Sequence, residues 1–140
     1  MILIACVDQK NGMTLNGRRQ TNDRAVRRLI LKEAYPKKII MAPSCATQFN
    51  KREQRWILCR ANPMESASEG SYCMIETEQA SSYVDRIERI VLYRWNTVYP
   101  ADVFFDLPLH MEWDLISQVM FDGFSHPDVV QEIYIRRKKR

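Results

Sequence analysis

The chain begins with six consecutive apolar residues, Ile2-Leu3-Ile4-Ala5-Cys6-Val7, and this run limits the possible folds more than any other feature. It is too short for a globular helix, and Asn11-Gly12 is a turn signal soon after it. An apolar run without alternation is typical of a strand that is buried on both faces. The sequence therefore predicts a central strand of an α/β sheet at residues 2–7, with a ligand crevice at its carboxyl end.

The rest of the chain predicts further strands with helices between them. Thr21-Asn22-Asp23 supplies a cap for a helix over residues 22–34, which has one apolar stripe and one basic side. Strands are expected at residues 38–42, 55–59, 72–75, 89–95, 113–121 and 129–135, short helices at 43–49 and 78–84, and a loop at 61–71. The pattern predicts parallel βα units followed by a closing antiparallel pair.

Composition places the chain among ordinary globular proteins. With 140 residues, 46% hydrophobic and 27% charged, it is expected to form a single domain over residues 1–140. Four cysteines occur without a C-x-x-C pair, and buried reduced thiols are expected. The opening run lacks the flanks of a signal peptide and the length of a membrane span, so we expect a cytoplasmic protein that does not contact a membrane.

Charge is divided unevenly along the chain. Residues 1–60 carry 13 Lys and Arg against 4 Asp and Glu, residues 61–135 carry 3 against 13, and residues 136–140 are all basic. Two explanations stay open. In the first, the basic half and the tail at 135–140 contact phosphates or RNA. In the second, the two oppositely charged halves face each other, either within one fold or across a dimer.

An ordered series of short motifs resembles the dihydrofolate reductase family over almost the whole chain. Leu3-Ile4-Ala5 with Asn11-Gly12-Met13 resembles that family's first strand and mobile active-site loop. The other matching segments are Lys38-Ile39-Ile40-Met41, Trp56-Ile57-Leu58 through Pro63, the spaced residues Leu92, Asp102, Phe105 and Trp113, and the stretch from Phe121 to Arg137. The resemblance implies a three-layer fold with a mostly parallel sheet, closed by a C-terminal antiparallel hairpin.

The chain departs from this family where the family binds NADPH. Ile75-Glu76-Thr77-Glu78 stands where the family has a Gly-Gly pair that lets the backbone approach the pyrophosphate. The phosphate-gripping turn is replaced by Ala42-Pro43-Ser44-Cys45. One peripheral strand and helix are missing between Pro63 and Gly70. No cofactor is therefore expected, unless the chain is a divergent reductase that still binds NADPH.

The resemblance also assigns candidate residues to a site. Asp23 stands near the family's pterin-binding carboxylate and is the candidate catalytic residue, although Arg19-Gln20-Thr21 replaces the family's preceding Trp and Pro. The other candidates fall into three groups: substrate contacts at Ala5, Met13, Arg19 and Tyr93; cofactor positions at Ser44, Glu76 and Thr77; and nucleic-acid contacts at Arg18, Arg24, Arg27 and Arg28.

Three functions remain open on this basis. The first is a reductase-like domain that has lost NADPH-dependent activity and binds a small molecule or a macromolecule. The second is a divergent NADPH-dependent reductase of a pterin-like substrate, with Asp23 orienting that substrate. The third is an RNA-binding or RNA-processing factor that uses the basic helix and the tail.

Other motifs predict little chemistry. His110 and His126 lack the spacing of a metal site and are expected in surface loops, so no metal is expected. The run Tyr93-Arg94-Trp95-Asn96-Thr97-Val98-Tyr99 fits either a stacking surface or a buried strand. Loss of the peripheral strand would leave residues 55–60 as a sheet edge, which predicts a symmetric homodimer that buries Trp56.

Overall fold

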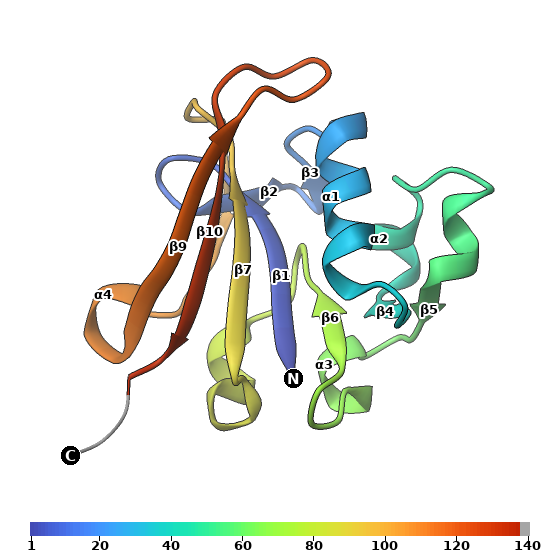
Figure 1. The fold of residues 1–140 in the computed structure, drawn as a ribbon, viewed down its shortest axis with the longest axis vertical. Coiled ribbons are helices and arrows are strands. Elements are labelled where there is room, and N and C mark those ends of the chain that lie inside the picture. Colours follow the sequence, from blue (N-terminus) through green and yellow to red (C-terminus); the bar gives the residue numbers. More distant parts are fainter. Residues whose placement is uncertain (138–140) are drawn as a thin grey trace.

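The computed structural model describes residues 1–137, so the expected basic tail at 135–140 is described only as far as Arg137. A seven-stranded sheet forms the centre of the molecule, with the strand order β5-β4-β6-β1-β7-β10-β9 (Figure 1). Its strands are β1 (Ile2–Val7), β4 (Ile39–Met41), β5 (Ile57–Cys59), β6 (Tyr72–Met74), β7 (Arg89–Arg94), β9 (Trp113–Phe121) and β10 (Val129–Arg136). The predicted α/β class is confirmed.

The opening run is the middle strand of this sheet, as its composition predicts. β1 pairs in parallel with β6 on one side and with β7 on the other. β4 continues the parallel half between β5 and β6, while β10 runs antiparallel to both β7 and β9. The carboxyl ends of the parallel strands therefore lie together at one end of the sheet, the top in Figure 1.

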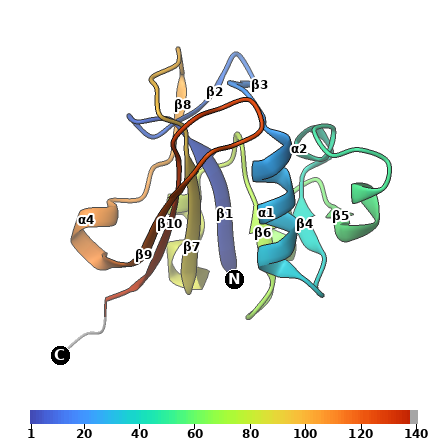
Figure 2. The ribbon, with the colours of Figure 1, turned by 45° about the horizontal axis from the view of Figure 1, so that its top comes forward.

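Both faces of the sheet are covered, which gives the three layers that the resemblance implies. The alternation of β1 sends Ile2 and Ile4 into the core on one face and Leu3 and Ala5 into the core on the other. On the first face lie α1 (Arg24–Ala34) and α2 (Pro43–Ala46), over the β4–β6 half of the sheet (Figures 1 and 2). The opposite face is covered by α3 (Pro63–Ser66), by the 3₁₀ segment η2 (Ala80–Arg86) and by the loop that carries Phe105 and Leu107.

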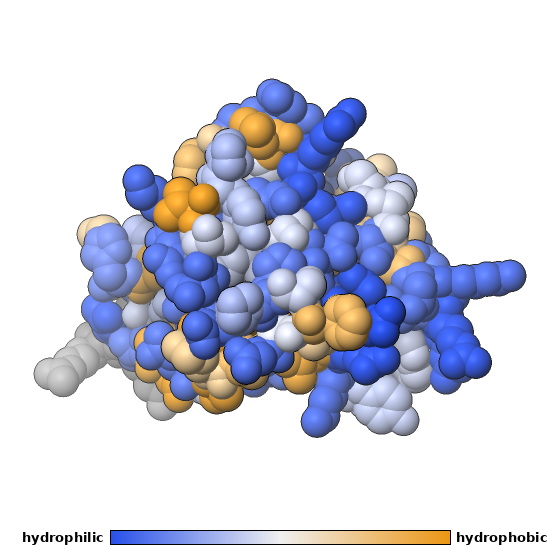
Figure 3. Space-filling model, turned by 90° about the horizontal axis from the view of Figure 1, so that it is seen from above, coloured by the Kyte–Doolittle hydropathy of each residue, from blue (hydrophilic) through white to orange (hydrophobic). Residues whose placement is uncertain are grey.

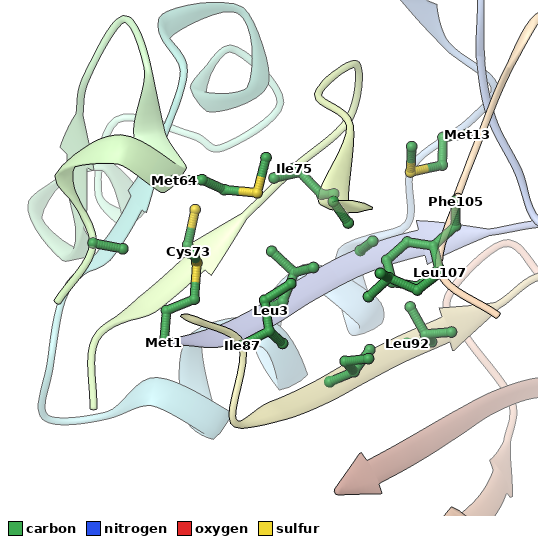
Figure 4. Close-up of a cluster of buried hydrophobic side chains, with 14 of the residues drawn as sticks. Met1, Leu3, Met13, Met64, Cys73, Ile75, Ile87, Leu92, Phe105 and Leu107 are labelled. Atoms are coloured by element: carbon green, nitrogen blue, oxygen red, sulfur yellow. The ribbon is translucent and has the colours of Figure 1, made fainter. Parts of the chain in front are cut away.

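The core under this second layer is built from separate stretches of chain. Figure 4 shows Leu3 and Leu92 on neighbouring strands, with Met64, Ile87 and Phe105 closing over them from three different connections. Because side chains from the segments between the strands also pack here, this core holds those segments in place against the sheet.

The structure differs from the sequence predictions in several local details. A 3₁₀ turn, η1 (Glu53–Trp56), precedes β5, and the expected loop at 61–71 contains α3. Cys59 is exposed rather than buried. A second sheet of order β3-β2-β8 was not predicted and is formed by β2 (Gly12–Leu15), β3 (Arg18–Arg19) and β8 (Val103–Phe104). α4 (Leu109–Glu112) carries exposed His110. Within residues 1–137, every helix is too short or too polar to cross a bilayer.

Candidate functional site

A buried carboxylate, Asp8, follows the central strand directly. Its side chain accepts hydrogen bonds from the backbone N–H groups of Lys10 and Gly12, both at 2.8 Å, from Tyr99 N at 3.1 Å and from Gln20 Nε2 at 3.0 Å. Burial alone would raise the pKa of Asp8, but these donors outweigh it and hold the pKa below its usual value. With its lone pairs occupied, Asp8 ties the small sheet to the end of the large one.

Arg19 and Glu76 form an ion pair across the carboxyl end of the parallel strands. Arg19 Nε lies 2.9 Å from Glu76 Oε2, and both side chains are largely buried. The Arg19 guanidinium also donates to the carbonyl oxygen of Ser44 at 2.7 Å and to Thr47 Oγ1 at 3.0 Å. Two expected cofactor positions, Ser44 and Glu76, are thus brought together on one arginine, whereas Thr77 is exposed beside them.

The Glu76 side chain is mostly buried, with 15% of it exposed. Burial raises the pKa of Glu76, and the Arg19 guanidinium opposes that shift. Gln48 Nε2 donates to the same carboxylate at 3.3 Å. The neighbouring Cys6 and Cys45 thiols also have raised pKa values, because of burial first and the Glu76 charge second, so they are poor nucleophiles.

Asp23, the candidate catalytic residue, is fully engaged in holding the fold. It caps α1, since Oδ1 accepts from Ala25 N at 2.8 Å and from Val26 N at 3.3 Å. It also binds the turn between β9 and β10, where Phe124 N and Ser125 N donate at 2.9 and 2.7 Å. Figures 1 and 2 show this turn reaching over the top of the sheet to the start of α1.

The Asp23 carboxylate is ionised at neutral pH. Burial alone would raise its pKa, but the hydrogen bonds from Ser125, His126, Phe124 and Val26 hold the pKa far below its usual value. No solvent reaches the side chain. In this structure the carboxylate is a structural anchor.

His126 corrects the expectation of a surface histidine, since its side chain is only 17% exposed. Its Nδ1 lies 3.0 Å from Asp23 Oδ2, and its ring packs 4.7 Å from the ring of buried Trp95. An ionised carboxylate only accepts, so Nδ1 carries a hydrogen and donates it. Nε2 then faces Thr21 Oγ1 at 2.9 Å, which completes a chain from Asp23 through His126 to Thr21.

A second ion pair at this end was not predicted at all. Arg94, the last residue of β7, binds both carboxylate oxygens of Glu132 at 2.9 and 3.0 Å. The same guanidinium donates to Asp8 O and to Asn11 Oδ1. The sequence shows one charged residue in each of two strands, Arg94 in β7 and Glu132 in β10. Their pairing could not be predicted from this, because only the register of β7 and β10 places the two side chains together.

The expected substrate contacts are not gathered around one opening. Ala5 and Met13 belong to the core on one face of the sheet and Tyr93 to the core on the other, and all three are buried. Tyr93 is held by Gln131, whose Nε2 lies 3.1 Å from the Tyr93 hydroxyl, and burial raises the pKa of that hydroxyl. Arg19, the fourth expected substrate contact, lines a surface hollow.

The expected nucleic-acid residues separate into three environments. Arg18 and Arg19 line a hollow of about 550 Å³ beside the small sheet. Arg24 and Arg28 are exposed on α1, whereas Arg27 is mostly buried against Glu53, with 3.6 Å between Nε and Oε1. The surface seen from above is mostly hydrophilic, with separate hydrophobic residues between the polar ones (Figure 3). Among residues 1–137 no group of three or more His, Cys, Asp and Glu side chains is arranged to hold a metal ion.

Comparisons with known proteins identify the architecture. Neither a family model nor a curated protein matches the sequence. A solved structure of dihydrofolate reductase from Enterococcus faecalis, complexed with NADP(H) and RAB-propyl, matches with a TM-score of 0.69 at 10% sequence identity. The match covers 98% of this chain and 96% of that one. Together with the strand order, it shows that this chain has the dihydrofolate reductase fold.

Proposed function

We propose that this chain is a dihydrofolate-reductase-like domain that does not turn over NADPH and serves as a binding module. The Arg19–Glu76 ion pair carries the proposal. A carboxylate that is 15% exposed stands where the family resemblance assigns a Gly-Gly pair next to the cofactor's pyrophosphate. Repulsion between like charges at about 4 Å costs about 1 kcal/mol in water and several times more in a partly dry site.

The positive charge of Arg19 offsets part of this repulsion, but Arg19 is not free to bind a phosphate. Its guanidinium is already bonded to Glu76, Ser44 and Thr47, so a phosphate would have to displace an existing charged partner. Asp23 supports the proposal independently. A carboxylate that accepts hydrogen bonds from helix α1, the β9–β10 turn and His126 has its lone pairs occupied, so orienting a pterin ring would require those bonds to break.

Titration with NADPH and with dihydrofolate, followed by tryptophan fluorescence, tests the proposal. We expect no saturable binding of either ligand in the micromolar range. The double variant Glu76→Gly/Thr77→Gly should gain measurable NADPH affinity, because it removes the charge and opens the backbone. Glu69→Gln, which changes an exposed acid elsewhere, is the matched control and should gain none.

The divergent-reductase alternative makes the opposite prediction. It requires micromolar NADPH binding by the unmodified chain and dihydrofolate-dependent NADPH oxidation at 340 nm. It also requires that Asp23→Asn abolish the oxidation in protein that circular dichroism shows to be folded. Either binding or turnover by the unmodified chain would refute the binding-module proposal.

For the partner of the module, the arrangement of charge favours an anionic macromolecule such as RNA. All four acids of residues 1–60 are internally engaged: Asp8 and Asp23 are buried, Glu33 pairs with Arg89, and Glu53 pairs with Arg27. The basic residues of that half include a series that is exposed: Arg18, Arg24, Arg28, Lys32, Lys37, Lys38, Lys51, Arg52, Arg55 and Arg60. The positive charge of this half is therefore presented to solvent.

A further inference from the structure

We propose that the surface between α1 and η1, formed around Tyr35 and Trp56 and called here the aromatic-basic surface, binds single-stranded nucleic acid. The inference rests on the macromolecule-binding form of the proposed function and gives it a partner and a site. The sequence predicts RNA contacts at the basic helix and the tail, and it leaves residues 93–99 open as a stacking surface. The structure adds two aromatic rings and separates the arginines that are free to act from those that are paired.

The two rings form a stacking platform. Their centroids are 5.3 Å apart at an interplanar angle of 62°, so the edge of one ring packs against the face of the other. Tyr35 is 66% exposed, which leaves a ring face open to solvent. The guanidinium of Arg55 lies 5.0 Å from the centroid of Trp56. Exposed aromatic rings beside arginine are the groups on which unpaired bases stack in sequence-tolerant binding.

Two adjoining hollows give this platform room for a ligand. One, of about 620 Å³, is lined by Arg28, Arg52 and Arg55 together with Leu31, Asn50, Glu53 and Trp56. The other, of about 290 Å³, is lined by Leu31, Lys32, Tyr35 and Trp56. The two hollows share Leu31 and Trp56 in their linings and so adjoin each other. Together they are called here the depression, and its lining includes the basic residues Arg28, Lys32, Arg52 and Arg55.

Basic residues continue from this depression along the helix. Arg24, Arg28 and Lys32 are four residues apart and exposed, so they form a single stripe down α1. Arg52 lines the larger hollow, and its neighbour Lys51 is exposed. Glu53 is the acid in the lining, and its Oε1 is occupied by Asn50 N at 2.8 Å and lies 3.6 Å from Arg27 Nε. The sugar-phosphate backbone of a bound strand can therefore lie along the stripe without meeting a free carboxylate.

This chemistry favours a single strand over a duplex and over a second copy of the chain. In a duplex the base faces are stacked on each other and cannot reach Tyr35 or Trp56. In a symmetric dimer centred on Trp56, the same patch faces itself, so Arg28, Arg52 and Arg55 would meet their own copies. Like charges brought together at an interface oppose association.

Fluorescence gives a direct reading of this surface. Trp56 is partly exposed, whereas Trp95 and Trp113 are each 2% exposed, so quenching by a stacked base reports mainly on Trp56. We expect oligouridine and oligothymidine of about 12 nucleotides to quench it saturably, and a blunt duplex of equal length to bind at least tenfold more weakly. With about four phosphate contacts, log K should fall against log salt with a slope near −3.

Variants separate stacking from charge. Tyr35→Ala, at an exposed position, and Trp56→Ala should each weaken binding about 5- to 100-fold. Arg28→Ala/Arg52→Ala should reduce the salt slope by about 1 to 2. The matched control is Phe104→Ala, an exposed aromatic on β8, and it should bind as the unmodified chain does. Fluorescence anisotropy of a labelled strand provides the same measurement where Trp56 is replaced.

Several outcomes overturn the inference. It is wrong if no strand binds at low salt, if Tyr35→Ala and Trp56→Ala leave affinity unchanged, or if duplex binds as tightly as a single strand. It is also wrong if Trp56→Glu converts a dimer into a monomer, since Trp56 would then lie in a self-interface. Because NADPH oxidation is measured at 340 nm and not by tryptophan fluorescence, any of these results can occur while the absence of NADPH turnover still holds.

Discussion

Asp23 shows how one residue connects parts of the chain that are far apart in sequence. Its carboxylate caps α1 and also accepts bonds from Phe124 and Ser125, about a hundred positions later. Gly123 is needed for this approach, because a Cβ at that position would lie 2.7 Å from Asp23 Oδ2. The helix start and the hairpin turn are therefore held by a single charge.

Asp23→Asn is expected to lower the free energy of unfolding by about 2–4 kcal/mol, since an amide cannot accept as many of the buried N–H bonds. It should also change the pH dependence. The depressed pKa of Asp23 gives the folded state stability that is fully present above the pKa of the unfolded chain, near 4, and is lost as pH falls toward the folded-state pKa. Urea denaturation at a series of pH values between 3 and 7 measures both effects.

The pH series contains its own control. Asp122→Asn changes an exposed acid in the same turn and should leave the acid slope of stability nearly unaltered. Asp8→Asn should flatten that slope in the same direction as Asp23→Asn, because the pKa of Asp8 is also lowered. Equal slopes in Asp23→Asn and the unmodified chain would contradict the anchoring role.

The Arg94–Glu132 pair makes a second prediction for single residues. The two side chains are 18% and 8% exposed, so removal of one partner leaves a buried charge uncompensated. Arg94→Met is expected to cost about 3–5 kcal/mol, and the double variant Arg94→Met/Glu132→Leu less than the sum of the two single ones. Chemical denaturation of all four proteins gives the coupling energy.

An exposed ion pair on the same hairpin is the matched comparison. Arg137 and Asp114 lie 2.9 Å apart but are 51% and 49% exposed. Arg137→Ala should therefore cost no more than about 1 kcal/mol. A large loss there, or strict additivity between the Arg94 and Glu132 substitutions, would show that burial does not determine the strength of these pairs.

Among the elements, the small sheet depends on its hairpin turn. Asn16 and Gly17 have φ values of 51° and 74°, and Leu15 pairs with Arg18 across them. This is the two-residue connection in which both residues are left-handed, and Asn-Gly is its preferred sequence. The hairpin places Arg19 on β3, opposite Thr14, and so positions it for Glu76.

Gly17→Ala is expected to destabilise the protein by about 1 kcal/mol. The cost arises from backbone strain alone, because an added Cβ meets nothing within 4 Å. Asn16→Gly keeps the required conformation and should change stability by less than about 0.5 kcal/mol. Hydrogen exchange should show faster opening of β2 and β3 in Gly17→Ala, and equal exchange in the two variants would contradict the assigned turn.

Local signals in the sequence predicted the large elements well, and they failed where contacts are distant. The apolar run at 2–7 and the alternation at 113–121 predicted β1 and β9 with their observed bounds. Asn16-Gly17 is a hairpin signal between residues 7 and 22, where no strand was predicted, so β2 and β3 were missed. His126 was predicted on the surface because no local pattern reveals that residue 126 meets Asp23; only the hairpin turn brings them together.

At the scale of the whole molecule, the two edges of the sheet differ in kind. The β5 edge is three residues long, and its surroundings include Arg55 and Arg60. The β9 edge is nine residues long and exposes apolar side chains on both faces, namely Leu115, Ile116, Val119 and Met120. A long apolar edge is the kind that pairs with another strand, whereas a short edge flanked by charge resists pairing.

Self-association therefore has two possible routes, and the homodimer predicted through Trp56 stays a prediction. We expect sedimentation velocity over a range of concentrations to show association through β9. Ile116→Lys/Met120→Lys should suppress it, and Trp56→Glu should not. A monomer at all concentrations would contradict both routes, and suppression by Trp56→Glu alone would favour the interface predicted from the sequence.

The central position of β1 also affects the order in which the sheet can form during synthesis. Residues 2–7 are synthesised well before either strand that flanks them, since β6 begins at residue 72 and β7 at residue 89. Until the ribosome has added those residues, both hydrogen-bonding edges of this strand lack their permanent partners. Pairing over such separations requires closure of long loops and is slow. The central strand of the finished sheet is thus the one whose edges stay unpaired longest on the nascent chain, and we expect a chaperone that binds the nascent chain to contact it.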